Sequence, residues 1–500
     1  MKHIAIRILL IALALMLGLS GVACASQPED SQNQQTPSTD NQPQEGTESE
    51  EEEEPQILPD VEMKDYNYTL SVMHWTCGEV NEFYTPWSEI CPPDDVTGPI
   101  GDIIEDAIYD RTGWLEENYG ITLTNMYQEH AALPTQVANL ISSGSDEFQV
   151  LVEFGFDAQR IMGKNYFLDL SLVPNIDFSK PWWIKESVEQ LALGEFVEVA
   201  ASDLLVLDKG ATSLIFYNIP MADDLGLGNL YEMVDNGEWT IEELAACAEL
   251  AYIDNGNDAR DEYDIYGIVN GDDPVLDLYT GAGMRFIARD DDGEYYFSYG
   301  FEEETLEVMT TVLEEIMYQD FFWNTWLTRD SVSEQPSFKD GESLFNVSMA
   351  KSCNSLRNME DSYGILPIPK YDEYQENYYS RVNNYHDSLI SVFNTAGDPE
   401  AVGAALEVLS YYSYYNIYPQ FYEVVIQGRG TRDEESMRML DIIFSTRTYD
   451  LGLIYGTEGF TDQVLRYTAH GDTNLASFVA SWENKLNTVM KALNELASDY

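Results

Sequence analysis

Aromatic and charged side chains occur together at three places in the first third of the sequence. Each place joins flat rings to a carboxylate or guanidinium group: Trp75 with Glu79, Tyr127 with Glu129, and Phe154 and Phe156 with Asp157 and Arg160. Flat aromatic faces pack against the C–H faces of sugar rings, and planar polar groups bind the hydroxyls at the ring edges. We therefore take Trp75, Phe154 and Phe156 as candidate platforms, with Glu79, Asp157 and Arg160 as their polar partners. The alternative for each ring is ordinary core packing.

Other kinds of chemistry find less support in the sequence. Glycoside hydrolysis needs two carboxyl groups about 5 to 10 Å apart, but a chain with 89 acidic residues offers such pairs by chance. There is no G-x-S-x-G motif, no CxxC pair, and only five histidines are present. A turn at Asp290 resembles the start of a calcium loop, but its twelfth position is Phe301, where a glutamate is required. We expect no catalytic residues, no metal and no cofactor.

A parallel sheet is predicted to position the three aromatic places. Hydrophobic patterning predicts strand, helix, strand, helix and strand, in turn, over residues 68–75, 100–119, 121–127, 133–143 and 148–154. This order is typical of a parallel sheet, which binds ligands at the carboxyl ends of its strands. The three aromatic places fall at those ends.

The N-terminus is predicted to be a secretion signal. Lys2 and Arg7 precede an apolar run over residues 8–17 and small residues up to Cys24, and this run is shorter than the roughly 20 residues of a membrane span. We assign residues 1–23 to the signal and Cys24 to lipidation, although ordinary cleavage next to Ala25 also fits. Residues 24–60 are polar and acidic, which predicts a disordered tether.

The charge balance limits the partners. With 25 basic and 89 acidic residues, the net charge of −64 repels phosphate backbones and anionic lipids. We therefore expect no nucleic-acid partner, and contact with a membrane through the lipid anchor only. Cys77 and Cys91 are close enough in sequence to form a disulfide outside the cell, and that pairing is left open.

Two later stretches have an ordered pattern. In the first, an apolar strand over residues 213–217 ends in Tyr217-Asn218 and is followed by Gly237-Glu-Trp-Thr240, with Glu243 completing a capping box. The second contains Phe338-Lys-Asp-Gly341, a short strand, and Tyr363-Gly-Ile-Leu-Pro-Ile-Pro-Lys370. Over residues 65–495 this order resembles the extracellular solute-binding proteins of ABC importers, in the sugar-binding branch (family 1) related to maltose-binding protein.

The resemblance implies an α/β, two-lobed periplasmic-binding-protein-like fold (type II), with mostly parallel sheets, a central cleft and hinge crossings. Residues 61–212 would form the first part of lobe 1 and 213–385 the first part of lobe 2. Residues 386–435 would return to lobe 1, and 436–500 would add C-terminal helices to lobe 2. Asp273, just before Pro274, resembles an acid-Pro pair that lines the sugar cleft in this branch.

Near the return crossing, Tyr385 and Asp387 are candidate ligand-binding residues on the hinge side. Five tryptophans are expected to be structural, namely Trp182, Trp183, Trp239, Trp323 and Trp326, although Trp323, if it lies in a loop, could reach the cleft.

The resemblance implies a monomeric, lipid-anchored receptor on the extracellular face of the cell membrane. It would bind a carbohydrate, expected to be an oligosaccharide, and deliver it to the membrane subunits of an ABC permease. A receptor for a peptide or another polar solute, and the ligand-binding module of a sensor, are the alternatives. A secreted glycoside hydrolase fits least, so we expect no enzyme.

Overall fold

The computed structural model describes residues 57–76, 87–93, 95–257, 259–290, 292–332, 334–426, 434–455, 457, 459–461, 463–464, 471 and 474–498. Cys24, Cys77 and Glu79 lie outside these ranges, as do the predicted signal and most of the predicted tether. The chain from Pro59 onward forms one compact unit. Among the described residues, no helix has the length and apolar character needed to cross a membrane.

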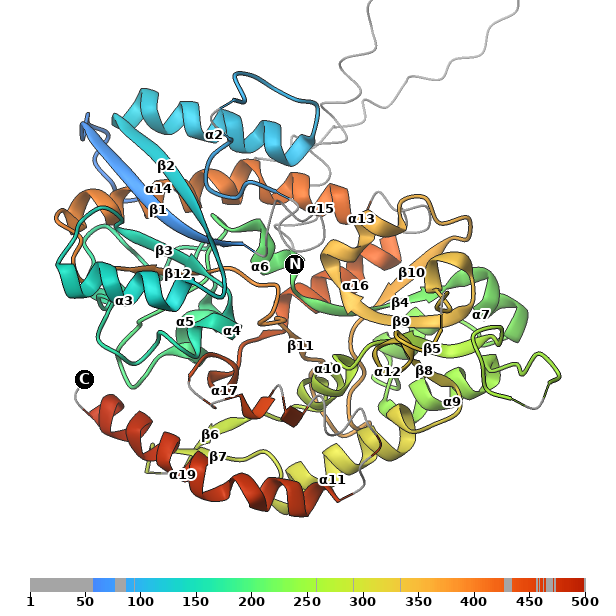
Figure 1. The fold of residues 1–500 in the computed structure, drawn as a ribbon. Coiled ribbons are helices and arrows are strands. Elements are labelled where there is room, and N and C mark those ends of the chain that lie inside the picture. The colour runs from blue at the N-terminus through green and yellow to red at the C-terminus, as the bar shows by residue number, and fades with distance from the viewer. Residues whose placement is uncertain are drawn as a thin grey trace, which may run out of the picture. The chain divides into compact units, whose positions relative to one another are not determined.

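The first sheet has four strands in the order β12-β3-β1-β2 (Figure 1). Its members are β1 (Tyr68–Thr76), β2 (Ile121–Glu129), β3 (Val150–Glu153) and β12 (Leu389–Val392). Strand β1 is parallel to β2 and β3, whereas β12 is antiparallel to β3. The helices α2 (Ile103–Tyr119) and α3 (Leu133–Ser143) connect the parallel strands. The predicted strand and helix order is therefore confirmed.

Local signals fix the ends of α2. The Asp102 carboxylate accepts hydrogen bonds from the backbone N–H groups of Ile104 and Glu105, which caps the first turn. The helix stops at Gly120, whose φ of 61° lies in the left-handed region that glycine tolerates best. Strand β2 begins at the next residue, so the end of α2 fixes where the pairing of β2 with β1 starts.

The second sheet has five strands in the order β10-β4-β9-β5-β8. Its members are β4 (Ser213–Asn218), β5 (Tyr266–Asn270), β8 (Phe322–Asn324), β9 (Ser343–Met349) and β10 (Tyr363–Leu366). Four of the seven strand pairings in the two sheets are parallel within the described residues. The predicted cap is also present, because the Thr240 hydroxyl accepts a 3.3 Å hydrogen bond from the Glu243 N–H.

Further helices cover the sheets and complete the two lobes. They are α5 (Lys185–Leu191), α6 (Val206–Gly210), α7 (Ile219–Leu225), α8 (Leu230–Asp235), α9 (Ile241–Ala251), α10 (Pro274–Gly281), α11 (Glu303–Val312), α14 (Pro399–Asn416), α15 (Tyr418–Ile426), α16 (Glu434–Ser445), α17 (Leu451–Ile454) and α19 (Leu475–Ser498). Helix α14 packs on α2 and β1, α16 packs on β10, and α17 packs on α4 (Gly155–Ala158) and α5. The indole N–H groups of Trp182 and Trp183 both donate to Glu407 in α14, at 3.0 and 2.7 Å, which gives both tryptophans structural roles.

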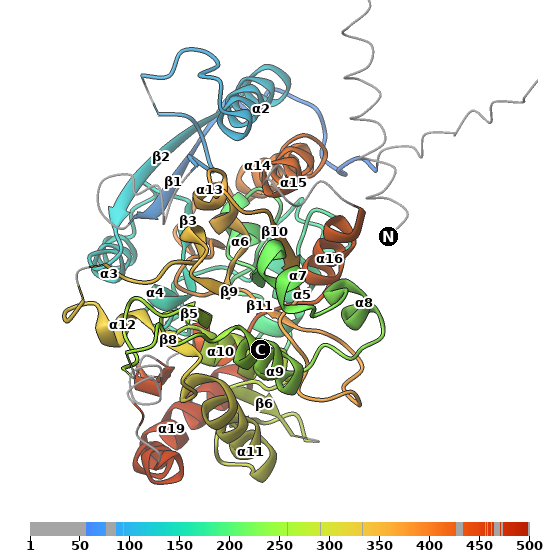
Figure 2. The same ribbon diagram turned by 90° about the vertical axis from the view of Figure 1, so that its right-hand side faces the viewer.

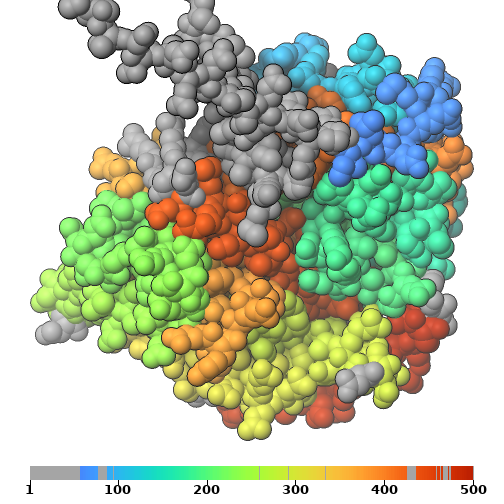
Figure 3. Space-filling model, turned by 180° about the vertical axis from the view of Figure 1, so that it is seen from behind, coloured from blue at the N-terminus to red at the C-terminus, as the bar shows by residue number. Residues whose placement is uncertain are grey.

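Within the described residues, three segments carry the chain between the sheets, and we call residues 211–213, 380–384 and 447–448 the hinge. In Figure 3 the teal surface belongs to the first lobe and the green surface to the second. Strand β11 (Ser380–Arg381) is parallel to β13 (Arg447–Thr448), and Val382 bridges Thr212 in an antiparallel pairing. The Asn383 N–H donates to the Ala211 carbonyl at 2.9 Å. The predicted hinge crossings are therefore present, and they are joined laterally by backbone hydrogen bonds.

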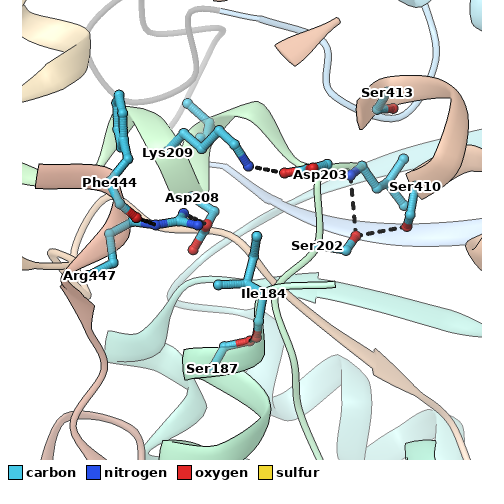
Figure 4. Close-up of polar contacts among 12 residues, drawn as sticks. Ile184, Ser187, Ser202, Asp203, Asp208, Lys209, Ser410, Ser413, Phe444 and Arg447 are labelled. Atoms are coloured by element: carbon cyan, nitrogen blue, oxygen red, sulfur yellow. Dashed lines mark hydrogen bonds and ion pairs between the residues drawn. The ribbon is translucent and has the colours of Figure 1, made fainter. Parts of the chain in front are cut away.

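Buried charges accompany the crossings (Figure 4). Lys209 pairs with Asp203, and the Arg447 guanidinium lies 2.6 Å from the Asp208 carboxylate. All four side chains are at most 7% exposed. Because a buried charge is costly without its partner, the Arg447–Asp208 pair ties the third crossing to the helix that precedes the first.

Candidate ligand-binding site

Four of the candidate aromatic residues form one continuous cluster beside the hinge. Trp75, near the end of β1, stacks on Phe154 with ring centroids 4.5 Å apart and an interplanar angle of 19°. Phe154 lies 6.0 Å from Phe156, which in turn stacks on Tyr385 at 4.8 Å. We call Trp75, Phe154, Phe156 and Tyr385 the aromatic cluster. Three segments distant in sequence build it.

The members of the aromatic cluster differ in exposure. Trp75 and Phe154 are 0% and 3% exposed, whereas Phe156 and Tyr385 are half-buried. The Trp75 indole N–H donates to the Ser388 hydroxyl at 3.4 Å, within the core of the first lobe. Phe156 and Tyr385 are therefore the members of the aromatic cluster with accessible surface, and the buried Phe154 ring lies next to Phe156. Ligand contact by Trp75 or Phe154 stays a prediction that requires those rings to become accessible.

Close packing around residue 155 explains why a glycine separates Phe154 from Phe156. Helix α4 begins at Gly155, and a Cβ there would lie 2.6 Å from Ile454 Cδ1 and 2.8 Å from Asn384 Cβ. The Gly155 N–H donates to the Asp387 carboxylate at 2.8 Å. Asp387 is buried, and burial raises its pKa well above the ordinary range. This carboxyl group positions α4 and, with it, the ring of Phe156.

The polar candidates of the first lobe lie at the edge of the same cluster. The Asp157 carboxylate is 3.4 Å from the Arg160 guanidinium and 3.6 Å from the His130 ring. Burial raises the pKa of Asp157 to about 6, and the neighbouring His130 and Arg160 act in the opposite direction. Arg160 is half-exposed and its guanidinium lies 5.4 Å from the centre of the Phe156 ring. An exposed cation and a flat ring are thus adjacent, as a hydroxyl-rich ligand requires.

Asp273 approaches the hinge from the second lobe. It precedes Pro274 at the start of α10, where Arg381 and Asn383 face its carboxyl group and oppose the rise in pKa that burial causes. Arg381 is also bound to Asp277 at 2.8 Å and to the Asn384 side-chain oxygen at 3.4 Å.

The Asn384 carbonyl in turn accepts a 2.8 Å hydrogen bond from the Phe156 N–H. The hinge segment around residues 381–387 therefore joins the candidates of the two lobes, while Glu79 lies outside the described residues.

Buried carboxyl groups extend beneath α4. Both Glu153 oxygens lack a hydrogen-bond partner, and the residue is fully buried at the end of β3. Glu198 accepts from the Gly163 N–H at 2.8 Å and from the Tyr455 hydroxyl at 3.3 Å through one oxygen only. Burial raises the pKa of Glu153 well above its usual range and that of Glu198 to about 7. Burial therefore favours the neutral form of both carboxyl groups.

The raised pKa of Glu198 predicts a pH-dependent stability. An ordinary glutamate ionises at 4.5, so between pH 4.5 and about 7 the unfolded chain releases a proton that the folded chain keeps. The free energy of unfolding therefore falls as pH rises through this window, by about 3 kcal/mol in order of magnitude. We expect Glu198→Gln to match the wild type near pH 4.5 and to be the more stable protein at pH 8, as measured by urea unfolding.

The control for this prediction is Glu195→Gln, because Glu195 is exposed and only three residues away. Its stability should follow the wild-type pH profile throughout. The prediction would be contradicted if the free energies of unfolding of wild type and Glu198→Gln changed in parallel from pH 4.5 to 8.

Comparisons with known proteins place the fold. No family model matches the chain, and no curated protein matches its sequence. Solved structures do match. The galacto-N-biose-/lacto-N-biose I-binding protein of an ABC transporter from Bifidobacterium longum superposes with a TM-score of 0.54 at 12% identity, covering 85% of this chain and 97% of that one. An ABC substrate-binding protein from Listeria monocytogenes, in complex with cycloalternan, gives 0.52 at 12% identity, covering 85% and 99%.

The fold is that of the two-lobed solute-binding proteins. A third match, the cyclic alpha-maltosyl-1,6-maltose binding protein from Arthrobacter globiformis, gives a TM-score of 0.51 at 10% identity and covers 86% of this chain and 99% of that one. The predicted two-lobed α/β fold is therefore confirmed. In this two-lobed solute-binding fold, the described candidate residues lie on the first lobe, at the hinge, and at the start of α10 in the second lobe.

One residue departs from its predicted role. Trp326 was expected to be structural, but it is 56% exposed, whereas Trp323 is buried in β8 against Tyr266. The exposure of Trp326 could have been predicted from Asn324, which ends the strand and caps a new helix. Because the strand has ended, Trp326 no longer follows the in-and-out alternation of its side chains.

Proposed function

We propose that this protein is the extracellular substrate-binding protein of an ABC transporter. In this proposal it binds a carbohydrate, an oligosaccharide, between its two lobes and delivers it to the membrane subunits of a permease. A lipid on Cys24 holds it, as a monomer, at the outer face of the cell membrane. It is a receptor and catalyses no reaction.

The aromatic cluster carries this proposal. Phe156 and Tyr385 present stacked, partly exposed rings beside the hinge, and the Arg160 guanidinium lies 5.4 Å from the Phe156 ring. Rings of this kind pack on the apolar faces of sugars, and charged groups at their edges bind hydroxyls. Similarly folded proteins from Bifidobacterium longum, Listeria monocytogenes and Arthrobacter globiformis are described as binding lacto-N-biose, cycloalternan and a cyclic maltosyl-maltose. The aromatic cluster and the ligands of these similarly folded proteins both favour a carbohydrate over a peptide.

The hinge supports a closing motion driven by the ligand. Asp273 in the second lobe and Phe156 in the first are both bound to the hinge segment that contains Asn383 and Asn384. A sugar that contacts both lobes would favour the closed arrangement by its differential affinity for that state. The Asp157, Glu153 and Glu198 carboxyl groups could suggest hydrolysis, but all three residues are buried. That placement favours a binding protein over a glycoside hydrolase.

Thermal unfolding with added ligands tests the proposal. A ligand at 100 times its dissociation constant stabilises the folded state by about 2.7 kcal/mol, which raises the melting temperature of a body of this size by about 3 °C. We expect such a rise with at least one oligosaccharide from a panel of α-glucans, β-glucans, mannans, xylans and galactans. Incubation should leave the sugar uncleaved on chromatography. A rise with short peptides alone, or release of shorter sugars, would overturn the proposal.

A further inference from the structure

Trp326 lies on α12 (Thr325–Thr328), the short helix that follows β8 in the second lobe. It is 56% exposed, while the other eight tryptophans are buried or half-buried. The adjacent Leu327 is 48% exposed. Single exposed apolar side chains are common on protein surfaces, so exposure alone decides nothing here. The way in which the ring is held is more informative.

Two contacts fix the backbone and ring of Trp326. The Asn324 side-chain oxygen accepts from the N–H groups of Trp326 and Leu327, at 3.0 and 3.2 Å, and its amide donates to Asp272 at 2.9 Å. The indole also lies close against Gly271, where a Cβ would stand 2.2 Å from the indole Cδ1 and 2.5 Å from Nε1. The ring is thus held in one position before any ligand arrives, which lowers the entropic cost of binding.

The position of Trp326 in the fold is one where ligands bind. Strands β5 and β8 are parallel neighbours, with Asn270 opposite Asn324 in the register. Both strands end at this edge, and the carboxyl edge of parallel strands is the usual ligand-binding edge of an α/β sheet. In Figure 2, α12 of the second lobe and α4 of the first lie on the same side of the hinge strand β11.

Polar groups accompany the ring. Asp272 precedes the candidate residue Asp273, and the Arg329 guanidinium lies 4.6 Å from the centre of the Trp326 indole. Arg329 is 58% exposed, so its guanidinium can move aside or bind a hydroxyl as a ligand arrives. A fixed flat ring beside a carboxylate and a cation repeats, in the second lobe, the chemistry of Phe156, Asp157 and Arg160.

We propose that Trp326 is a carbohydrate-binding platform of the second lobe, on which one sugar ring packs while Asp272 and Arg329 bind its hydroxyls. This inference rests on the proposed function, because it names a contact for the same class of ligand. It replaces the sequence-based expectation of a structural role. It also gives the second lobe an exposed aromatic surface, where the first lobe has Phe156.

The test compares wild type with Trp326→Ala, Gly271→Ala and Leu327→Ala on an array of α-glucan, β-glucan, mannan, xylan and galactan oligosaccharides. For any sugar that the wild type binds, we expect Trp326→Ala to bind at least about tenfold more weakly. Gly271→Ala keeps the indole but displaces it, so it should weaken binding in the same direction. Leu327→Ala, the control on the same helix, should stay within about twofold of wild type.

The outcomes separate this inference from the function on which it rests. A wild type that binds sugar together with a Trp326→Ala variant of unchanged affinity would overturn the platform and leave the receptor standing. Equal losses in Trp326→Ala and Leu327→Ala would overturn it too, since the helix and not the ring would then matter. A wild type that binds no oligosaccharide on the array removes both proposals. Unchanged melting temperatures of the unliganded variants establish that all of them are folded.

Discussion

Arg381→Met should lower the free energy of unfolding by about 3 to 5 kcal/mol. Arg381 is 1% exposed, bonds Asp277 at 2.8 Å, and faces Asp273 from the hinge. Methionine fills much of the same volume but leaves the buried Asp277 and the half-buried Asp273 without their cation, and breaking a buried pair in this way is strongly destabilising. Urea unfolding followed by circular dichroism and by tryptophan fluorescence measures the change.

A matched control is available in the same protein. Arg438 also binds an aspartate, through bonds of 3.1 and 2.6 Å to Asp235, but both partners are about two-fifths exposed. Arg438→Met should therefore cost only about 0 to 1 kcal/mol. Adding Asp277→Asn to Arg381→Met should restore part of the loss, because it removes one of the stranded charges. Equal effects of the two arginine substitutions would show that burial of the ion pair is not what matters.

Trp75→Ala should destabilise the protein by a similar amount, about 3 to 5 kcal/mol. The indole is fully buried and stacks on Phe154 at 4.5 Å, so truncation removes a large apolar surface and leaves a cavity beside the Phe154 ring. The Ser388 hydroxyl also loses its indole partner. The midpoint of urea unfolding is the measurement.

Trp326→Ala is the natural comparison for this second prediction, because it removes the same side chain from an exposed position. Its cost in stability should lie within about 0.5 kcal/mol. Trp75→Phe should fall between the two, since it keeps a ring on Phe154 but loses the hydrogen bond to Ser388. A Trp75→Ala variant as stable as wild type would mean that Trp75 carries no packing role.

Elements with strong local signals were predictable from the sequence. Helix α3 occupies residues 133–143 as expected, with Pro134 in its first turn and Gly144 at its end in the left-handed conformation. Strand β4 begins at Ser213, and the Thr240 hydroxyl caps α9. In each case the deciding interactions lie within a few residues of one another, so the pattern of side chains is sufficient.

Other features depend on contacts between distant residues. Asp277 and Arg381 are 104 positions apart, and nothing near either residue indicates that they pair. The burial of Trp75 depends on Phe154 and on Ser388, which reaches it only after the chain has returned from the second lobe. Trp323 and Trp326 are three residues apart, and their different exposures follow from the point at which β8 ends, which alternation alone does not fix.

The path of the chain has a consequence for how the protein is assembled. All five strands of the second sheet come from one continuous stretch, residues 213–366, whereas the first sheet receives β12 only at Leu389–Val392. In a chain that emerges N-terminus first, the later lobe can complete its sheet while the earlier one still presents β3 as an unpaired edge. Such an edge is a template for aggregation. The first sheet is begun before the second and completed after it, and it needs protection in the interval.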